Sequence, residues 1–199
     1  WRRNFSQESE LILQVYYDRY FKTDAPGKTS DEINSADVDF QHRFLVRNRH
    51  SILWGLKYRH VNDDFVSGSS FLAILPQRKD LSLATAFIQD EVTLSDKFKI
   101  TLGSKIAHNL YTGIEIQPGI RVCLNVGRTQ TLWAAISRAV RTPSRVDVDY
   151  FSPSTPQPPT AVSVTGGPDF VSEKVLAFEL GYRIQPNAKS TLAIATFYN

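Results

Sequence analysis

The chain has 199 residues, a formal net charge of +3 and one cysteine, Cys123. Its lysines and arginines are scattered, which argues against a nucleic-acid footprint, and a lone cysteine excludes an internal disulfide and a thiolate zinc site. No run approaches the ~18 consecutive apolar residues of a transmembrane helix. A membrane β-barrel remains compatible, because its strands need only about 10 residues of alternating polarity.

Alternation with a period of two dominates the chain from its first segment onward, as expected for half-buried strands. In residues 11–20, Leu11 and Val15 share one face while Gln14 and Asp18 share the other. The apolar positions of the later segments are Val38, Phe40 and Phe44; Ile52, Trp54, Leu56 and Tyr58; Phe98, Ile100, Leu102 and Ile106; Ile120, Val122 and Leu124; and Leu176, Phe178, Leu180 and Tyr182. We therefore predict about nine antiparallel strands, each with one apolar and one polar face.

Two predicted strands carry a charge among their apolar positions. The segment from Leu81 to Leu94 contains Asp90, and the segment from Thr131 to Arg141 contains Arg138. Such a charge is costly in the middle of a bilayer, so we expect each to lie near a rim or beside a β-bulge.

The links between the predicted strands alternate in length. Tight turns fit at residues 47–50, 95–97, 127–129 and 185–189, and a moderate link fits at 109–113. Longer polar links are expected at Lys22–Ser35, Asn62–Lys79 and Thr142–Ser172. The last contains a Pro-rich run at 153–159 and the run Thr-Gly-Gly-Pro at 165–168, both of which suit an irregular loop. Short turns on one rim and long loops on the other are typical of outer-membrane barrels.

The polar faces carry charges of both signs, which are expected of a hydrated barrel wall whether or not a solute touches them. They are Asp18, Asp39, Arg43, Lys57, Arg59, Lys99, Lys105, Arg121 and Arg183. No phosphate-binding Gly loop, metal-spaced His pair or nucleophile elbow occurs, and the four histidines fall on separate segments. We therefore predict neither an enzyme nor a metal or cofactor site.

Several segments together resemble the β-barrel of TonB-dependent receptors. They are Phe87-Ile88-Gln89-Asp90-Glu91, Asn109-Leu110-Tyr111-Thr112-Gly113, Gln117-Pro118, the run from Leu132 to Ser144, Phe178-Glu179-Leu180-Gly181-Tyr182 and Phe197-Tyr198-Asn199. The resemblance covers roughly Val38 to Asn199. It implies an all-β, antiparallel up-and-down transmembrane barrel, of which residues 1–199 form a part, in a family with about 22 strands and a plugged lumen.

The resemblance also implies a function and partners. Members of this family lie in the bacterial outer membrane, bind a scarce nutrient such as a ferric siderophore or cobalamin, and import it with energy from the TonB complex. Methionine is absent, the chain starts at Trp1, and neither a plug nor a TonB box is visible. We therefore expect a fragment whose open edges aggregate in water and whose parent contacts lipid, the TonB complex and a small-molecule ligand.

The candidate ligand-binding residues are the arginines beside the longest link. Arg138, Arg141 and Arg145 flank Thr142–Ser172, and several arginines together suit an anionic ligand. Two other classes remain open at this point. A passive porin or translocator barrel shares the alternation, and a soluble β-sandwich binding module places the apolar faces inward instead.

Overall fold

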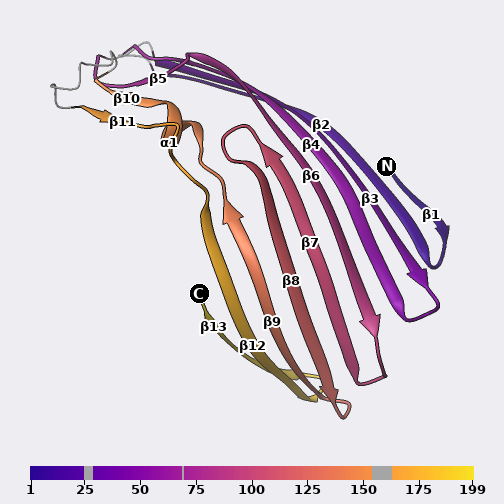
Figure 1. Cartoon of the computed structure of the whole chain (residues 1–199). Coiled ribbons are helices and arrows are strands. Elements are labelled where there is room, and N and C mark those ends of the chain that lie inside the picture. The colour runs from indigo at the N-terminus through magenta and orange to yellow at the C-terminus, as the bar shows by residue number, and fades with distance from the viewer. Residues whose placement is uncertain (25–28, 69, 154–162) are drawn as a thin grey trace.

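The computed structural model describes residues 1–24, 29–68, 70–153 and 163–199 and consists almost entirely of antiparallel strands. Ten of them form one curved sheet in the order β1-β2-β3-β4-β6-β7-β8-β9-β12-β13 (Figure 1). These strands are β1 (Arg2–Ser6), β2 (Ser9–Asp24), β3 (Thr29–Val46), β4 (His50–Val66), β6 (Arg78–Thr93), β7 (Phe98–Asn109), β8 (Gly113–Val126), β9 (Gln130–Arg141), β12 (Glu173–Asn187) and β13 (Ser190–Tyr198). The order follows the chain, so the predicted up-and-down topology is confirmed.

The estimate of about nine strands was one too low for this sheet. The missed strand is β1, whose residues Arg2-Arg3-Asn4-Phe5-Ser6 are too short and too polar to show alternation, yet pair with β2. The tight turns at 47–50, 95–97 and 127–129 are confirmed. The last turn is shorter than expected, because β12 continues through Pro186 to Asn187.

The long links were only partly correct. The expected link Lys22–Ser35 is wrong at both ends, since β2 runs to Asp24 and β3 starts at Thr29 with continuous pairing; residues 25–28 lie outside the described part. The link expected at Asn62–Lys79 narrows to residues 67–77. The link from Thr142 to Ser172 is confirmed, although residues 154–162, with most of the Pro-rich run, are outside the described part.

The two larger links build a small second sheet at one end of the molecule. Its order is β11-β10-β5, with β5 (Ala73–Ile74) from the link before β6, and β10 (Tyr150–Ser152) and β11 (Val164–Thr165) from the link before β12. A single turn of helix, α1 (Arg145–Asp149), leads into β10 (Figure 1). The two links therefore form one unit.

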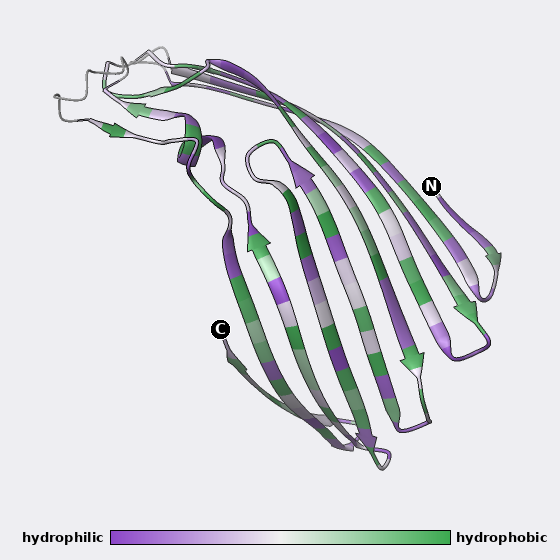
Figure 2. Ribbon diagram, in the orientation of Figure 1, coloured by the Kyte–Doolittle hydropathy of each residue, from purple (hydrophilic) through white to green (hydrophobic). Residues whose placement is uncertain are grey.

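The apolar face of the main sheet is continuous across its strands. Partner residues place Leu102 beside Ile120, Ile120 beside Ile136, and Ile136 beside Phe178, and the alternation is visible along β7, β8 and β9 (Figure 2). The 12 residues of β7 span ~40 Å along the strand and ~30 Å along the axis of a barrel tilted by about 40°. That height fits the ~25 Å outward apolar band of a membrane barrel.

The polar face is concave. A hollow of about 910 Å³ lies on this side, lined by residues such as Lys99, Lys105, Arg121 and Arg183. In a closed barrel this face borders the lumen, and the apolar face borders lipid. We call them the lumen face and the lipid face.

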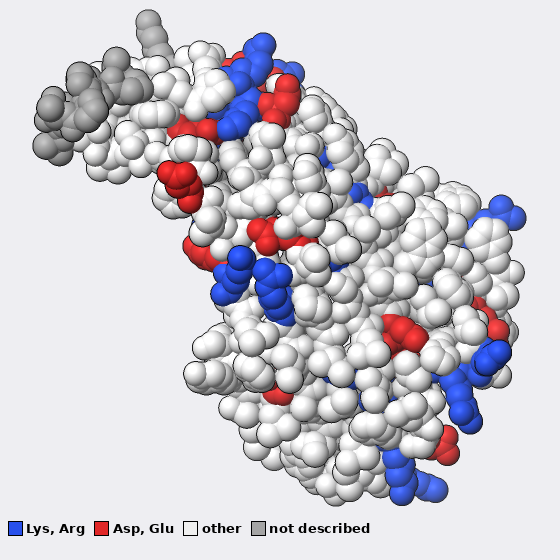
Figure 3. Space-filling view, in the orientation of Figure 1, with Lys and Arg blue, Asp and Glu red and all other residues white. Residues whose placement is uncertain are grey.

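Beyond the β7–β8 turn, the polarity of the two faces changes. The row Arg19–Asn34–Asn62–Asp80 continues the lipid face but is polar throughout. On the lumen face, the apolar residues Val61 and Leu81 lie side by side, whereas the part of this face below the β7–β8 turn carries polar residues such as Lys57 at the equivalent positions. The projecting ends of β2, β3, β4 and β6 therefore have the pattern of strands in water, and charged side chains crowd this end of the molecule (Figure 3).

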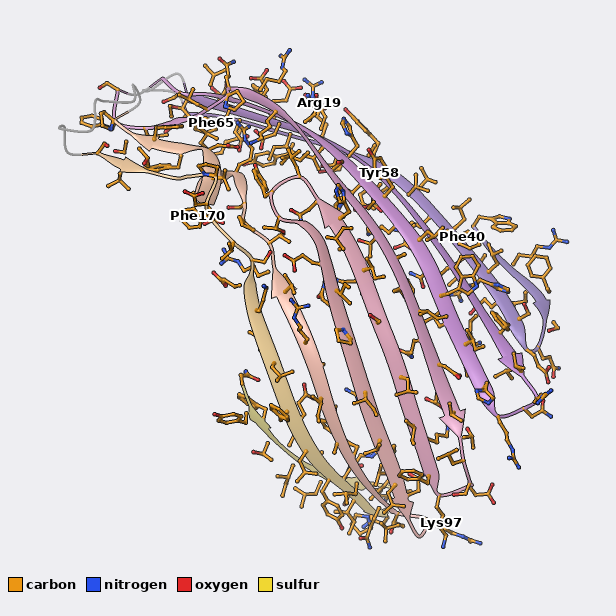
Figure 4. The ribbon with its side chains drawn as sticks, in the orientation of Figure 1. Arg19, Phe40, Tyr58, Phe65, Lys97 and Phe170 are labelled. Atoms are coloured by element: carbon orange, nitrogen blue, oxygen red, sulfur yellow. The ribbon has the colours of Figure 1, made fainter. Side chains whose placement is uncertain are left out.

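The residues labelled in Figure 4 mark the same division. Phe40 and Tyr58 lie along the sheet, Arg19 and Phe65 lie on its projecting part, and Lys97 lies in a short turn at the opposite end. This division explains the failed prediction at Lys22–Ser35. Strands with polar residues on both faces resemble a loop in sequence, although their backbone pairing continues.

Gly181 of β12 is required by close packing on the lumen face. A Cβ atom built there would come within 2.2 Å of the Trp133 ring, which also lies 5.2 Å from the Arg121 guanidinium. We expect Gly181→Ala to lower the free energy of unfolding by about 1–3 kcal/mol, because Trp133 must move. The loss is measured from the temperature at which the electrophoretic mobility of the protein shifts on heating in detergent. Gly119→Ala is the matched control, since its Cβ would meet Ser137 at an ordinary 3.5 Å, and equal losses for both variants would contradict the argument.

Candidate functional site

The long-link end of the molecule is organised around Arg145, the first residue of α1. Its side chain is only 5% exposed and forms ion pairs with Asp63 of β4 and with Asp149 at the end of α1. It also donates to the carbonyl oxygen of Pro76. A guanidinium with five donors in a fixed plane suits such a set of acceptors from three segments. Arg145 therefore joins the link before β12 to the link before β6.

Asp149 is the second centre of this network. Lys79 Nζ lies 2.8 Å from both of its carboxylate oxygens, and the Tyr111 hydroxyl donates to it over 3.1 Å. Lys79 also lies 4.6 Å from the centroid of the Tyr111 ring. Burial, followed by the Asp149 charge, raises the pKa of Tyr111 above its ordinary value of 10.0, so its hydroxyl remains a donor. The network attaches α1 to β6 and to the β7–β8 turn, and we call Asp63, Lys79, Tyr111, Arg145 and Asp149 the anchor cluster.

The start of α1 is fixed by a capping box. Ser144 donates to Asp147 Oδ2 through both its backbone N–H and its hydroxyl, each over 2.8 Å, and its hydroxyl accepts from the Asp147 N–H. This arrangement satisfies N–H groups that the first turn leaves without partners. The hydrogen bonds from the Ser144 backbone and then its side chain lower the pKa of Asp147 below the ordinary 3.8.

A lowered pKa in the folded state predicts how α1 depends on pH. The contribution of Asp147 is fully present above pH 3.8 and is lost as the pH falls through the lower folded value. We expect amide protection in residues 145–150 to decline over that range, after correction for intrinsic exchange rates. Asp147→Asn should show the weakened protection at every pH, and a wild-type protection that stays constant down to pH 2 would contradict the prediction.

Ion pairs also connect neighbouring strands on the lumen face. Asp37 of β3, which is almost fully buried, lies between Tyr16 and Arg59 in the strand register, and Arg59 Nε donates to it over 2.8 Å. Arg59 also donates to the Tyr16 hydroxyl, and Lys57 Nζ lies 3.3 Å from Asp37 and 3.7 Å from Asp39. These charges are cross-strand neighbours, so they hold the wall together.

The three candidate arginines occupy different environments. Arg145 is buried in the anchor cluster. Arg141 is 65% exposed and pairs with Glu173, which lies opposite it on β12. Arg138 lies on β9 opposite Leu176, on the lipid-face side, and donates to the carbonyl oxygen of Ile116 on β8. The structure thus does not bring the three guanidinium groups together to form one anion site.

Asp90 and Arg138 both lie near strand ends, as expected. Asp90, close to the end of β6, is 2.7 Å from His50 Nδ1. Arg138 lies where pairing between β8 and β9 stops, after Gly119 and Ser137. The residue of β8 just before Gly119 is Pro118, and proline has no N–H to continue the ladder toward β9. The Arg138 side chain thereby reaches the buried Glu115, at 3.8 Å.

Sequence reasoning missed most of the anchor cluster. Asp63 and Lys79 fall in the link expected at Asn62–Lys79, and Asp149 falls in the link expected at Thr142–Ser172. No local spacing identifies the anchor cluster, because its five residues come from four separate segments of the chain. Within the described ranges, no three His, Cys, Asp or Glu side chains form a group that could hold a metal ion. The only helix in these ranges, α1, is far too short to cross a membrane.

Comparison with known proteins places this architecture. Residues 2–199 match the family described as TonB dependent receptor-like, beta-barrel. The chain belongs to this TonB-dependent receptor family. No curated protein sequence matches it.

Solved receptor structures agree with the family assignment. A variant of the ferric enterobactin receptor PfeA from Pseudomonas aeruginosa, in complex with enterobactin, has a TM-score of 0.78 at 15% identity, over 98% of this chain and 33% of its own. The siderophore receptor PirA from Acinetobacter baumannii has a TM-score of 0.75 at 14% identity, over 98% of this chain and 33% of its own. The ferric yersiniabactin uptake receptor FyuA from Yersinia pestis has a TM-score of 0.57 at 15% identity, over 96% of this chain and 33% of its own. At such identities the likeness shows the fold, and the chain spans about a third of each receptor.

Proposed function

We propose that this chain is part of the barrel wall of an outer-membrane receptor that binds a scarce nutrient and imports it with energy from the TonB complex. The family match over residues 2–199 carries the proposal. The lipid face, with its row from Leu102 to Phe178, supports a place in the bilayer. In this proposal the remaining strands, the plug and the TonB-binding segment belong to the rest of the receptor, and the chain has no catalytic role.

The proposed ligand is a metal chelate such as a ferric siderophore, or cobalamin, bound at the end that carries the long links. The similar structures include receptors for ferric enterobactin and ferric yersiniabactin. Among the three candidate arginines, Arg141 is the most exposed and has a guanidinium that an anionic ligand can reach. A direct role for Arg145 requires its buried ion pairs to break first. We therefore assign ligand contact chiefly to Arg141, and a separate, lesser contact to Arg138, which lies on the lipid-face side of β9.

Uptake by cells tests this function. The receptor is produced at full length in bacteria that lack their own receptors, with and without a working TonB complex, and accumulation of radiolabelled ferric chelates and cobalamin is measured. We expect uptake of one compound only when the TonB complex is present. Uptake that is equal in both strains would indicate a passive pore and contradict the proposal.

The arginines are tested in the same cells. Replacing Arg138, Arg141 and Arg145 together should abolish binding of the transported compound at the cell surface. Arg141→Gln alone should weaken this binding by roughly tenfold or more, as expected when a charge-assisted hydrogen bond is lost. Binding that is unchanged in the triple variant would contradict the assignment.

A further inference from the structure

An apolar hollow lies in the mostly polar lumen face, at the point where α1 covers the projecting strands. Its volume is about 360 Å³. Its floor is formed by the side of β4 and β6 that faces the lumen, and its roof by the residues that lead into α1. The apolar lining residues are Val61, Leu81, Leu83, Leu110, Pro143 and Val146.

The position of these residues in the sheet makes the hollow unusual. Leu83 lies opposite Arg59, and Leu81 lies opposite Val61, so the floor continues the same face that carries Asp37 and Arg59 lower down. A lumen wall in contact with water is expected to be polar. Apolar residues here therefore face either a covering group or a ligand, because leaving them in water forgoes the free energy of burial.

The hollow is held open by the anchor cluster. Arg145 fixes the roof to Asp63 on β4, beside the floor, and Tyr111 from the β7–β8 turn is held by Asp149. The charged groups at its edge are thus already paired: Arg59 with Asp37, and Arg145 with Asp63 and Asp149. A site whose walls are fixed and whose charges are satisfied favours an uncharged apolar group over an ion.

We propose that this hollow is a binding subsite for an uncharged ring-sized group, aromatic or aliphatic, of the small molecule that the receptor takes up. The identity of the molecule rests on the proposed receptor function. The chemistry of the subsite is independent of that function. The exposed guanidinium of Arg141 binds the anionic part of such a ligand, and the hollow takes its apolar part.

Competition among small thiols tests the subsite without the natural ligand. Val146 is 57% exposed at the roof, and Val146→Cys places a thiol at the opening. The full-length receptor with Cys123→Ser is equilibrated with an equimolar mixture of the symmetric disulfides of benzyl, cyclohexyl, sulfonatoethyl and ammonioethyl thiols and a trace of free thiol, so that the protein thiolate displaces one thiol from each disulfide it attacks. Mass spectrometry then measures which disulfide forms.

We expect the two ring-bearing thiols to exceed the two charged ones by roughly tenfold or more at Val146→Cys. Val164→Cys is the matched control, because Val164 is 66% exposed in the same link and does not line the hollow. This control also accounts for partition of the ring-bearing thiols into detergent, and we expect a preference under about twofold there. Adding Leu110→Gln to Val146→Cys should remove the enrichment, and since Leu110 lies exposed in a turn, this change leaves the strands intact.

Two outcomes would overturn the proposal. The first is equal enrichment at Val146→Cys and Val164→Cys, which means that the hollow has no affinity of its own. The second is a Val146→Cys thiol that no probe reaches, which means that another segment of the receptor fills the space. Either result leaves the uptake experiment unaffected, so failure of the subsite is distinguishable from failure of the receptor function.

Discussion

Replacing Arg145 with methionine is expected to release the long links from the main sheet. The variant leaves the carboxylate of Asp63 without its buried partner, and removing one member of a buried ion pair typically costs about 3–5 kcal/mol. Asp149 loses one partner but keeps Lys79. The loss should be local to the small sheet, because the ladders of β7, β8 and β9 do not involve the anchor cluster.

Hydrogen exchange measures this release at identifiable backbone bonds. The Leu75 N–H donates to Asp149 over 2.8 Å, and the Gly166 N–H donates to Tyr150 over 2.7 Å. Both should exchange faster in Arg145→Met by at least a hundredfold, which corresponds to about 3 kcal/mol of local opening. Exchange in β7 and β8 should stay unchanged.

Arg141→Met is the control for the loss of an arginine. Arg141 and its partner Glu173 are 65% and 68% exposed, and an exposed ion pair contributes about 1 kcal/mol or less. We therefore expect little change in exchange at Leu75 and Gly166. Similar acceleration in the two variants would show that Arg145 does not anchor the links.

The sheet could be predicted from the sequence wherever one face meets lipid and the other meets water. In β7 and β8 most residues of the lipid face are apolar, so strand limits and facing followed from positions such as Leu102 and Ile120. The same rule failed at Thr29–Ser35, where both faces meet polar surroundings and alternation carries no information. It also missed β1, whose five residues are held by pairing with β2.

The roles of individual charges could not be predicted, because they depend on partners far along the chain. Arg145 contacts Asp63, which is 82 residues away in the sequence. Arg141 lies only four residues before Arg145, and the two differ in the exposure of their side chains, which the sequence does not reveal. Asp90 and Arg138 looked misplaced on an apolar face. Their explanations are a histidine on the neighbouring strand and a proline that ends the β8–β9 ladder, and neither leaves a periodic signal.

Two neighbouring residues of β9 give the sharpest test of the assigned faces. Ile136 lies in the middle of the lipid face, between Ile120 and Phe178, and is 44% exposed. Ser137 follows it on the lumen face, opposite Gly119. Ile136→Lys should lower the stability of the barrel in lipid bilayers by about 2–4 kcal/mol, because the ammonium group then enters the hydrocarbon.

Ser137→Lys carries the same charge on the same strand and should change stability by less than about 1 kcal/mol, since the lumen face is hydrated and Gly119 leaves room beside it. Guanidinium titrations of the full-length receptor in vesicles, followed by tryptophan fluorescence, measure both variants. A larger loss for Ser137→Lys than for Ile136→Lys would contradict the assigned faces. A water-soluble module with Ile136 in its core would give the same order of the two variants, but Ile136→Lys would then unfold the protein in plain buffer, without any lipid.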